Sequence, residues 1–259
     1  MIRLDIFSDP VCPWCLIGKA NLDRALEAHP EHPFAIQWHP FQLNPDMPAE
    51  GVDKRSYLAG RFGGEDKVDA IHDRLRQMAK QAGVDMDPDK PQRLPNTLNA
   101  HRLIHWAGLE GRQTAMVSAL FKAYWRDGRD IGDAQVLAEI AAAVGLDGAA
   151  IARLLASDAD ADDIAARDAD ARKKGVTAVP TFLIAQQYVV SGAQPPEMWR
   201  DVMLDKLYSY SDELMELEKA SWGYMRDKNL EGMRGYLADN ALLIFSDGSR
   251  YNKREMLAL

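Results

Sequence analysis

Two cysteines, Cys12 and Cys15, are the residues whose type and spacing most directly permit chemistry in this sequence. They are the only cysteines of the chain, and Pro13 and Trp14 separate them. Thiols at this spacing can close into a disulfide and open again, because one thiolate attacks a disulfide and the other resolves the mixed disulfide. The spacing therefore predicts a redox-active dithiol, with Cys12 attacking and Cys15 resolving.

The flanking residues predict that this pair opens a helix. Residues 2–7 alternate apolar and polar types, which is the period of a strand. After the cysteines, small and apolar residues recur at helical spacing, with Lys19 on the opposite, polar face: Gly18, Leu22, Ala25 and Leu26. Pro13 suits the first turn of such a helix. Because the amino end of a helix favours an anion, we expect Cys12 to be a moderately reactive thiolate.

Two other interpretations of the cysteine pair remain open. The first is a zinc site completed by His29 and His32, although each histidine precedes a proline and their spacing is one residue short of a zinc finger. The second is an inert, buried pair. His101 and His105 stand four residues apart and could also ligate a metal, but no acidic residue lies close by. We therefore predict packing or surface roles for these two histidines, and no metal.

The composition restricts the classes of partner. The chain has 259 residues and a formal net charge of −8, and it contains no long basic run that would bind nucleic acid. No apolar run approaches the roughly 20 residues of a membrane span. The first strand begins at Ile2, so we expect no signal peptide and a cytoplasmic protein, whose cysteines the ambient thiols keep largely reduced.

The order of elements predicts an α/β fold. Residues 34–41 read as a second strand, which completes a strand–helix–strand unit. A helical block of roughly 100–120 residues follows, too long for a structureless loop. Asp133 and Asp147 are expected to cap two of its helices. Residues 181–184 and 188–190 then predict a β-hairpin, and a helix begins near Glu197.

Several motifs together resemble those of the DsbA family of thioredoxin-fold oxidoreductases, in particular its FrnE-like members. The matching motifs are residues 8–18, 41–48, 96–97, 100–106, 128–133, 175–182 and 191–196. The resemblance implies a thioredoxin fold with a large helical insertion between the second and third strands. It implies thiol–disulfide exchange through Cys12 and Cys15, with Pro13 and Trp14 shaping the redox poise. It also implies a cis Val179–Pro180 peptide bond that faces the dithiol and docks substrate backbone.

The same architecture occurs in 2-hydroxychromene-2-carboxylate isomerases and kappa-class glutathione transferases, which bind glutathione. By that resemblance, Asn44, Asn96 and His101 are candidates to line a glutathione pocket. Many thioredoxin-fold enzymes also carry a buried acid six residues before the first cysteine. Here that position is Ile6, and Asp5 should point to the opposite face of the strand. The chain is therefore expected to lack this proton carrier.

We therefore predict three parts of the chain. They are a split thioredoxin-fold domain of residues 1–63 and 175–207, an inserted helical subdomain of residues 64–174, and an extension of residues 208–259. In the extension we predict two helices, a strand at residues 241–245 and a third helix capped by Asn252. This order resembles the opening of a SnoaL-like (nuclear transport factor 2-like) domain, which needs about twice this length. Because so short a unit buries little surface, we expect it to pack on the body or to pair with a second copy as a homodimer. A poorly ordered, truncated tail is the alternative.

The sequence thus predicts a thiol–disulfide oxidoreductase that reduces or isomerises protein or small-molecule disulfides. No tightly bound cofactor is expected; glutathione is a candidate co-substrate, and glutathione or a thioredoxin system a candidate reductant. The first alternative is a glutathione-dependent isomerase or transferase. The second is a non-catalytic binding or chaperone-like module.

Overall fold

The computed structural model describes residues 1–204, 242–244 and 250–252. The chain divides into two compact units, Met1–Pro196 and Glu197–Leu259. Among the described residues, no helix combines the length and the apolar character that crossing a membrane requires.

In the first unit, the described strands build a four-stranded mixed sheet in the order β2-β1-β5-β6. Strand β1 (Ile2–Ser8) pairs in parallel with β2 (Phe34–Pro40), and helix α1 (Pro13–Ala28) connects them. Strand β5 (Thr181–Ile184) runs antiparallel to β1 and forms a hairpin with β6 (Tyr188–Ser191). The predicted strand–helix–strand unit and hairpin are both confirmed, and the arrangement is that of a thioredoxin fold.

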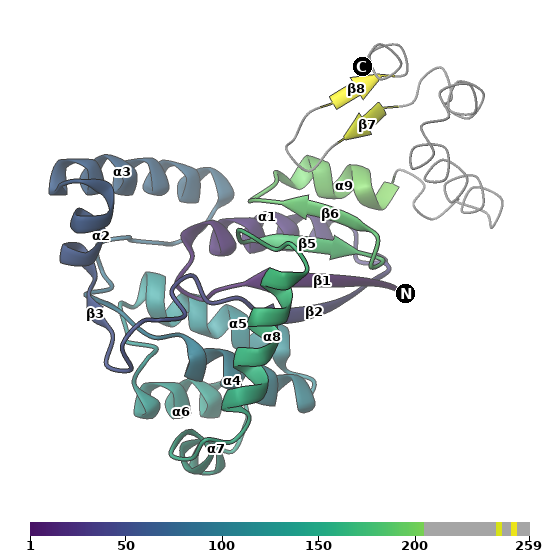
Figure 1. Ribbon diagram of the computed structural model, residues 1–259. Coiled ribbons are helices and arrows are strands. Elements are labelled where there is room, and N and C mark those ends of the chain that lie inside the picture. The colour runs from purple at the N-terminus through teal and green to yellow at the C-terminus, as the bar shows by residue number, and fades with distance from the viewer. Residues whose placement is uncertain (205–241, 245–249, 253–259) are drawn as a thin grey trace. The chain divides into compact units, whose positions relative to one another are not determined.

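The central position of β1 explains its composition. Leu4 and Ile6 are almost fully buried, and so is Asp5 on the other face of the strand. Helix α1 lies over one face of the sheet, while α5 and α8 pack against β2 from the other (Figure 1). A strand covered on both faces tolerates a carboxylate only when it is paired. Asp5 accordingly lies 2.7 Å from the Arg3 guanidinium and 2.5 Å from the His39 ring.

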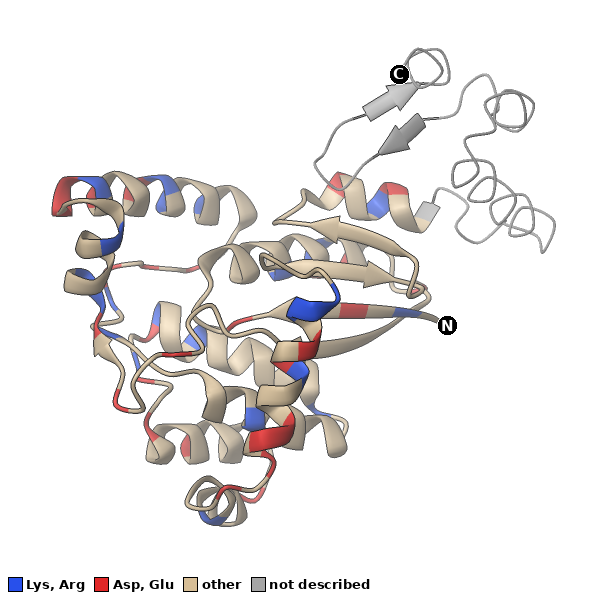
Figure 2. Ribbon diagram, viewed as in Figure 1, with Lys and Arg blue, Asp and Glu red and all other residues tan. Residues whose placement is uncertain are grey.

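The predicted helical insertion lies between β2 and β5, as a run of helices and two short strands. Its elements, in chain order, are β3 (Val52–Asp53), α2 (Lys54–Phe62), α3 (Glu65–Ala82), β4 (Arg93–Leu94), α4 (Leu98–Leu109), α5 (Gln113–Phe121), the π-helix η1 (Lys122–Arg126), α6 (Ala134–Ala143), α7 (Gly148–Leu155) and α8 (Ala161–Lys173). Acidic and basic residues alternate along α3 and α8 (Figure 2), as expected of solvated helix faces.

Several local features of the insertion can be compared with the sequence. Asp133 and Asp147 accept hydrogen bonds from the backbone N–H groups that open α6 and α7, so both predicted caps are confirmed. The antiparallel pairing of β3 with β4 and the π-helix were not predicted. A π-turn leaves no simple apolar period in the sequence, and two-residue strands are too short to show one.

One prediction for α1 is wrong. Lys19 was expected on a solvent-facing side of this helix, but it is buried, with its ammonium group 2.5 Å from the Asp23 carboxylate. Neighbouring elements therefore cover part of the polar face of α1 as well as the apolar face that packs on the sheet. The aliphatic stem of a lysine allows such burial while its charge stays paired.

In the second unit, the described elements are α9 (Pro196–Leu204) and an antiparallel pair formed by β7 (Leu242–Ile244) and β8 (Arg250–Asn252). The strand predicted at residues 241–245 is confirmed for Leu242–Ile244. Asn252, predicted to cap a helix, is the last residue of β8. The helices predicted elsewhere in residues 208–259, and the SnoaL-like resemblance that rests on them, lie outside the described residues.

Candidate active site

The dithiol lies where β1 gives way to α1. Cys12 is the N-cap residue of α1 in an extended conformation, and Pro13 occupies the first turn, as predicted. The backbone N–H of Cys12 donates to the Asp9 carbonyl at 2.9 Å, and that of Cys15 donates to the Cys12 carbonyl at 3.1 Å. Both cysteines are free thiols. The Cys12 side chain therefore sits at the end of the helix where the first backbone N–H groups have no partner within the helix.

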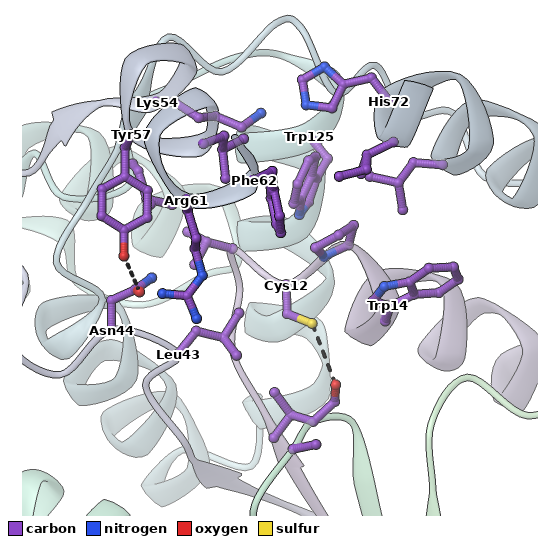
Figure 3. Close-up of a pocket in the computed structure, with 18 of the residues that line it drawn as sticks. Cys12, Trp14, Leu43, Asn44, Lys54, Tyr57, Arg61, Phe62, His72 and Trp125 are labelled. Atoms are coloured by element: carbon purple, nitrogen blue, oxygen red, sulfur yellow. Dashed lines mark hydrogen bonds between the residues drawn. The ribbon is translucent and has the colours of Figure 1, made fainter. Parts of the chain in front are cut away.

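The loop before β5 meets Cys12 from the other side. The Val179–Pro180 peptide bond is cis, and the Cys12 thiol lies 3.6 Å from the Val179 carbonyl oxygen (Figure 3). Gly18 lets this loop approach α1 closely, because a Cβ at this position would lie 3.0 Å from the Pro180 ring and 3.3 Å from the Ala193 Cα. Residues far apart in sequence thus meet at the sulfur.

Cys15 occupies a different environment. Both residues are buried, Cys12 at 3% and Cys15 at 1% exposure, but the Cys15 thiol faces the Ser8 hydroxyl and the backbone N–H of Asp9. Burial raises the pKa of the Cys15 thiol well above its ordinary value, and the neighbouring Cys12 raises it further. Cys15 therefore holds its proton in the reduced protein. Cys12, in contrast, lines a cavity that an incoming group can enter.

This cavity has a volume of about 360 Å³ and opens beside the Cys12 sulfur (Figure 3). Most of its walls are aromatic or aliphatic side chains from seven separate stretches of the chain: Val11, Trp14, Leu43, Leu58, Phe62, Ile71, Leu75, Leu94, Trp125 and Val179. Its polar lining residues include Asn44, Lys54, Tyr57, Arg61 and His72. An apolar pocket with a few polar groups beside a nucleophile is the usual form of a small-molecule site.

Beneath the dithiol lies a fully buried carboxyl group, that of Asp9. It accepts hydrogen bonds from the backbone N–H of Leu43 at 2.7 Å, that of Val11 at 3.3 Å and the Thr97 hydroxyl at 3.4 Å. These bonds tie the loop that carries Cys12 to the exit of β2 and to the start of α4. They favour the carboxylate, but burial outweighs them and raises the pKa of Asp9 to about 7.

His101 faces this carboxyl group from α4, with its Nε2 3.9 Å from Asp9 Oδ1. This nitrogen is buried and has no hydrogen-bond partner among the residues that the structure describes. Burial lowers the pKa of His101 to about 4, so the ring is neutral near pH 7. His101 and Asp9 therefore form a buried pair in which the imidazole carries no charge near pH 7.

The helical insertion supports the Cys12 loop directly. Trp125, in the π-helix η1, donates from its indole nitrogen to the Pro10 carbonyl at 3.0 Å. The Lys54 ammonium lies 5.0 Å from the centre of the same ring and donates to the Pro88 carbonyl at 2.5 Å. Burial lowers the pKa of Lys54 to about 8. A π-turn thus aims one tryptophan at the active-site loop.

We expect Trp125→Phe to loosen this loop, because it leaves the buried Pro10 carbonyl without a donor. The free energy of unfolding should fall by about 1–2 kcal/mol, and alkylation of Cys12 by a small haloacetamide should change in rate. Trp106→Phe is the matched control, since the Trp106 indole also donates a hydrogen bond, to Asp160 at 2.8 Å, away from the dithiol. It should cost similar stability and leave the alkylation rate unchanged. Equal alkylation rates in both variants would contradict a loop-supporting role for Trp125.

The other predicted residues are only partly brought together. Asn44 lines the cavity, where its Oδ1 accepts from the Tyr57 hydroxyl at 2.8 Å (Figure 3). Asn96 and His101 are not among the described lining residues, because Asn96 donates to the Met47 carbonyl and His101 lies in the core beside Asp9. Spacing along a helix could not tell which face of α4 turns inward.

The zinc interpretation of the cysteine pair fails on geometry. Cys12 precedes the first residue of α1 and His29 follows the last, so the 16 residues of the helix separate them, which is about 24 Å. His101 and His105 also differ in surroundings, since His101 is buried and His105 contacts the Arg167 guanidinium at 3.4 Å.

The sequence did not single out three residues of the site: Asp9, Arg61 and Trp125. Asp9 stood inside a recognised motif, but nothing in its spacing showed that it would be buried. Arg61 and Trp125 come from α2 and η1, and only the packing of these two helices places them near Cys12. A lone aromatic or cationic residue on a helix carries no such information.

The sheet topology and the Cys-x-x-Cys pair at the head of α1 define a thioredoxin-like domain. Within that class, the chain belongs to the family described as DSBA-like thioredoxin domain, whose model matches residues 3–203. This membership supports an oxidoreductase or isomerase activity.

Individual proteins resemble the same part of the chain. The uncharacterized protein YwbO of Bacillus subtilis (strain 168) is 26% identical over 207 residues, which cover 79% of this chain and 97% of YwbO. The crystal structure of SCO1869, a probable DsbA oxidoreductase of Streptomyces coelicolor, is similar to this structure with a TM-score of 0.72. The two sequences are 31% identical, and the match covers 79% of this chain and 89% of SCO1869. The cytosolic disulfide reductase DsbM of Pseudomonas aeruginosa, solved with GSH, is similar in fold, with a TM-score of 0.58 and 21% identity over 79% of this chain and 98% of that chain.

Proposed function

We propose that this protein is a thiol–disulfide oxidoreductase that reduces or isomerises disulfides through Cys12 and Cys15. One observation carries the proposal: of two free thiols in a Cys-x-x-Cys pair, Cys12 caps a helix and lines a cavity, and Cys15 is buried directly behind it. This is the asymmetry that an attacking and a resolving thiol require. Pro13 and Trp14 fix the turn between them.

The exchange proceeds in two steps. The Cys12 thiolate attacks one sulfur of a substrate disulfide, which breaks the substrate S–S bond and releases one substrate thiolate. Cys15 then loses its proton and attacks the Cys12 sulfur, which expels the second substrate thiolate and leaves a Cys12–Cys15 disulfide. The substrate gains two electrons. A low-molecular-weight thiol such as glutathione, or a thioredoxin system, returns the protein to its dithiol form.

Extended substrates have a docking point in this proposal. The Val179 backbone faces the Cys12 sulfur across 3.6 Å, and a strand-like segment could pair with this backbone beside the sulfur. A reducing compartment, as for the cytosolic relative DsbM, makes reduction or isomerisation the working direction.

A glutathione-dependent isomerase or transferase is the second candidate. The cavity beside Cys12 favours it, because such an enzyme needs room for a small substrate next to the bound thiol, and DsbM was solved with GSH. In that case, activity would saturate with glutathione and would not depend on Cys15.

For the organisation of the chain, we propose that residues 64–174 form a subdomain inserted in a split thioredoxin domain of residues 1–63 and 175–207. Residues 208–259 would be an extension whose partner is the body or a second copy. Light scattering of the full chain and of a chain ending at residue 207 would test the second statement. A monomer in both forms would contradict homodimerisation through the extension.

A glutathione redox titration tests the proposed function. The protein is equilibrated with mixtures of reduced and oxidised glutathione, and its free thiols are counted by alkylation and mass spectrometry. We expect a single two-electron transition between the dithiol and the Cys12–Cys15 disulfide, and reduction of insulin by the dithiol form. A pair that never closes into a disulfide would overturn the proposal. Activity that needs Cys12 and glutathione but not Cys15 would support the second candidate.

A further inference from the structure

The charges around the cavity are of one sign. Its described lining residues include two cationic side chains, Lys54 and Arg61, and no aspartate or glutamate. The whole chain, in contrast, carries a formal net charge of −8. The net negative charge of the protein repels an anionic ligand from most of its surface, whereas the cationic side chains of the cavity attract one. This contrast indicates that the cavity receives a negatively charged group.

Arg61 is the cation available to such a group. It makes no hydrogen bond and no ion pair with any residue that the structure describes. Arg55, on the same helix, is bonded to Glu65 and Asp69 at 3.2 and 3.0 Å. The guanidinium group of Arg61 points from α2 into the cavity, over Leu43 and beside Asn44 (Figure 3). Lys54 is less available, because it is buried and already donates to Pro88.

Asn44 supplies a second donor at the same place. Its Oδ1 accepts from the Tyr57 hydroxyl at 2.8 Å, which orients the amide and leaves its Nδ2 to donate. A guanidinium with a neighbouring amide N–H matches the two oxygens of a carboxylate. Both groups lie on the side of the cavity opposite Trp14 (Figure 3).

The rest of the cavity suits an apolar body. Trp14, Phe62 and Trp125 present ring surfaces around Cys12, with aliphatic side chains between them. Flat apolar groups pack well on such surfaces. The volume of about 360 Å³ fits a small molecule rather than a folded protein.

We propose that this cavity is a subsite for low-molecular-weight disulfides that carry a carboxylate on an apolar, preferably aromatic, body. The carboxylate binds Arg61 and Asn44, the body packs between the tryptophans, and the disulfide lies at the Cys12 sulfur. This inference rests on the proposed function. Cys12 attacks the nearer sulfur, the S–S bond of the substrate breaks, and the aryl thiolate leaves; Cys15 then displaces the second thiolate. No further reductant is needed for a single turnover of the reduced protein.

The test compares two aromatic disulfides that differ in charge. Dithiobis(nitrobenzoate) carries a carboxylate on each ring, and dithiodipyridine carries none. Both release coloured thiols, so single-turnover rates with the reduced full-length protein can be followed by stopped-flow absorbance. The variants are Arg61→Gln, Arg61→Lys and, as a control of equal charge change, Arg74→Gln. Arg74 is an exposed residue of α3 outside the cavity lining.

We expect Arg61→Gln to slow the reaction with the dicarboxylate by roughly tenfold or more, which is the usual worth of a charge-assisted hydrogen bond. The neutral disulfide should react at an unchanged rate. Arg61→Lys should recover part of the lost rate with the dicarboxylate. Arg74→Gln should have little effect on that rate because it changes only the net charge of the protein.

Equal slowing of the dicarboxylate by Arg61→Gln and Arg74→Gln would overturn the subsite, because net charge alone would then explain the preference. So would equal losses with both disulfides. In either case the neutral reagent still reports Cys12 chemistry, so the proposed function would stand. Failure of both reagents to react with Cys12 in the unmodified protein would instead overturn the proposed function.

Discussion

Replacing Cys12 by serine is expected to abolish disulfide reduction. A serine hydroxyl at the head of α1 is not ionised near neutral pH and cannot form a disulfide, so the first step has no nucleophile. The loss should be on the order of a thousandfold or more, as for other enzymes deprived of their nucleophile. Insulin reduction measures it, with Cys12→Ala as a second variant. Thermal unfolding of both variants checks that the fold is retained.

Replacing Cys15 by serine should produce a different defect. Cys12 can still attack, but nothing expels the captured substrate, so a mixed disulfide on Cys12 accumulates. Intact-protein mass spectrometry after exposure to oxidised glutathione should show one glutathione adduct, absent from Cys12→Ser. The opposite pattern, with adducts only on Cys15, would mean that the roles of the two thiols are reversed.

Replacing Asp9 by asparagine should change how stability depends on pH. The folded-state pKa of Asp9 is about 7, above its ordinary value of 3.8, because burial disfavours the charged form. The folded protein therefore keeps a proton that the unfolded chain releases. The stabilisation from this group is fully present below about pH 4 and is lost as the pH rises through about 7. For a fully buried group, the change is on the order of a few kcal/mol.

Asparagine cannot ionise, so Asp9→Asn should remove most of this decline. It should also cost a constant amount of stability, because its amide would meet the N–H donors that now bond the carboxyl group. Urea unfolding of the protein at several pH values between about 4 and 8 measures both effects. Asp46→Asn is the control, since Asp46 is an exposed carboxylate on a nearby loop. An unchanged slope in Asp9→Asn would show that another group dominates the pH dependence.

The chemistry and the framework around it could be predicted from sequence because both leave local patterns. The strand and helix periods on either side of Cys12 and Cys15 are strong, and the caps at Asp133 and Asp147 are local features. The packing of the insertion leaves no such pattern. Trp125 and Arg61 looked like ordinary helix residues, and the chain does not reveal that η1 and α2 face the dithiol.

The burial of polar side chains is the second feature that the sequence does not predict. The helical period places Lys19 on a solvated face and predicts no role for Asp9, although both residues are buried. A hydrophobic pattern assumes that charged residues avoid the interior, and it fails where hydrogen bonds or an ion pair make burial tolerable. Ile6 was correctly noted as the departure from the usual buried acid. The acid that the structure does bury near the dithiol is instead Asp9, on the loop.

Much of the cavity wall is encoded in a different part of the gene from Cys12, whose sulfur the wall surrounds. Codons 12–15 specify the reacting atoms, while those for α2, α3 and η1 specify about half of the residues that surround the incoming molecule. Exchange of the inserted helices between relatives would therefore alter which compounds are turned over and leave the electron transfer itself intact. A family built in this way can diversify its substrates by recombination within one stretch of DNA.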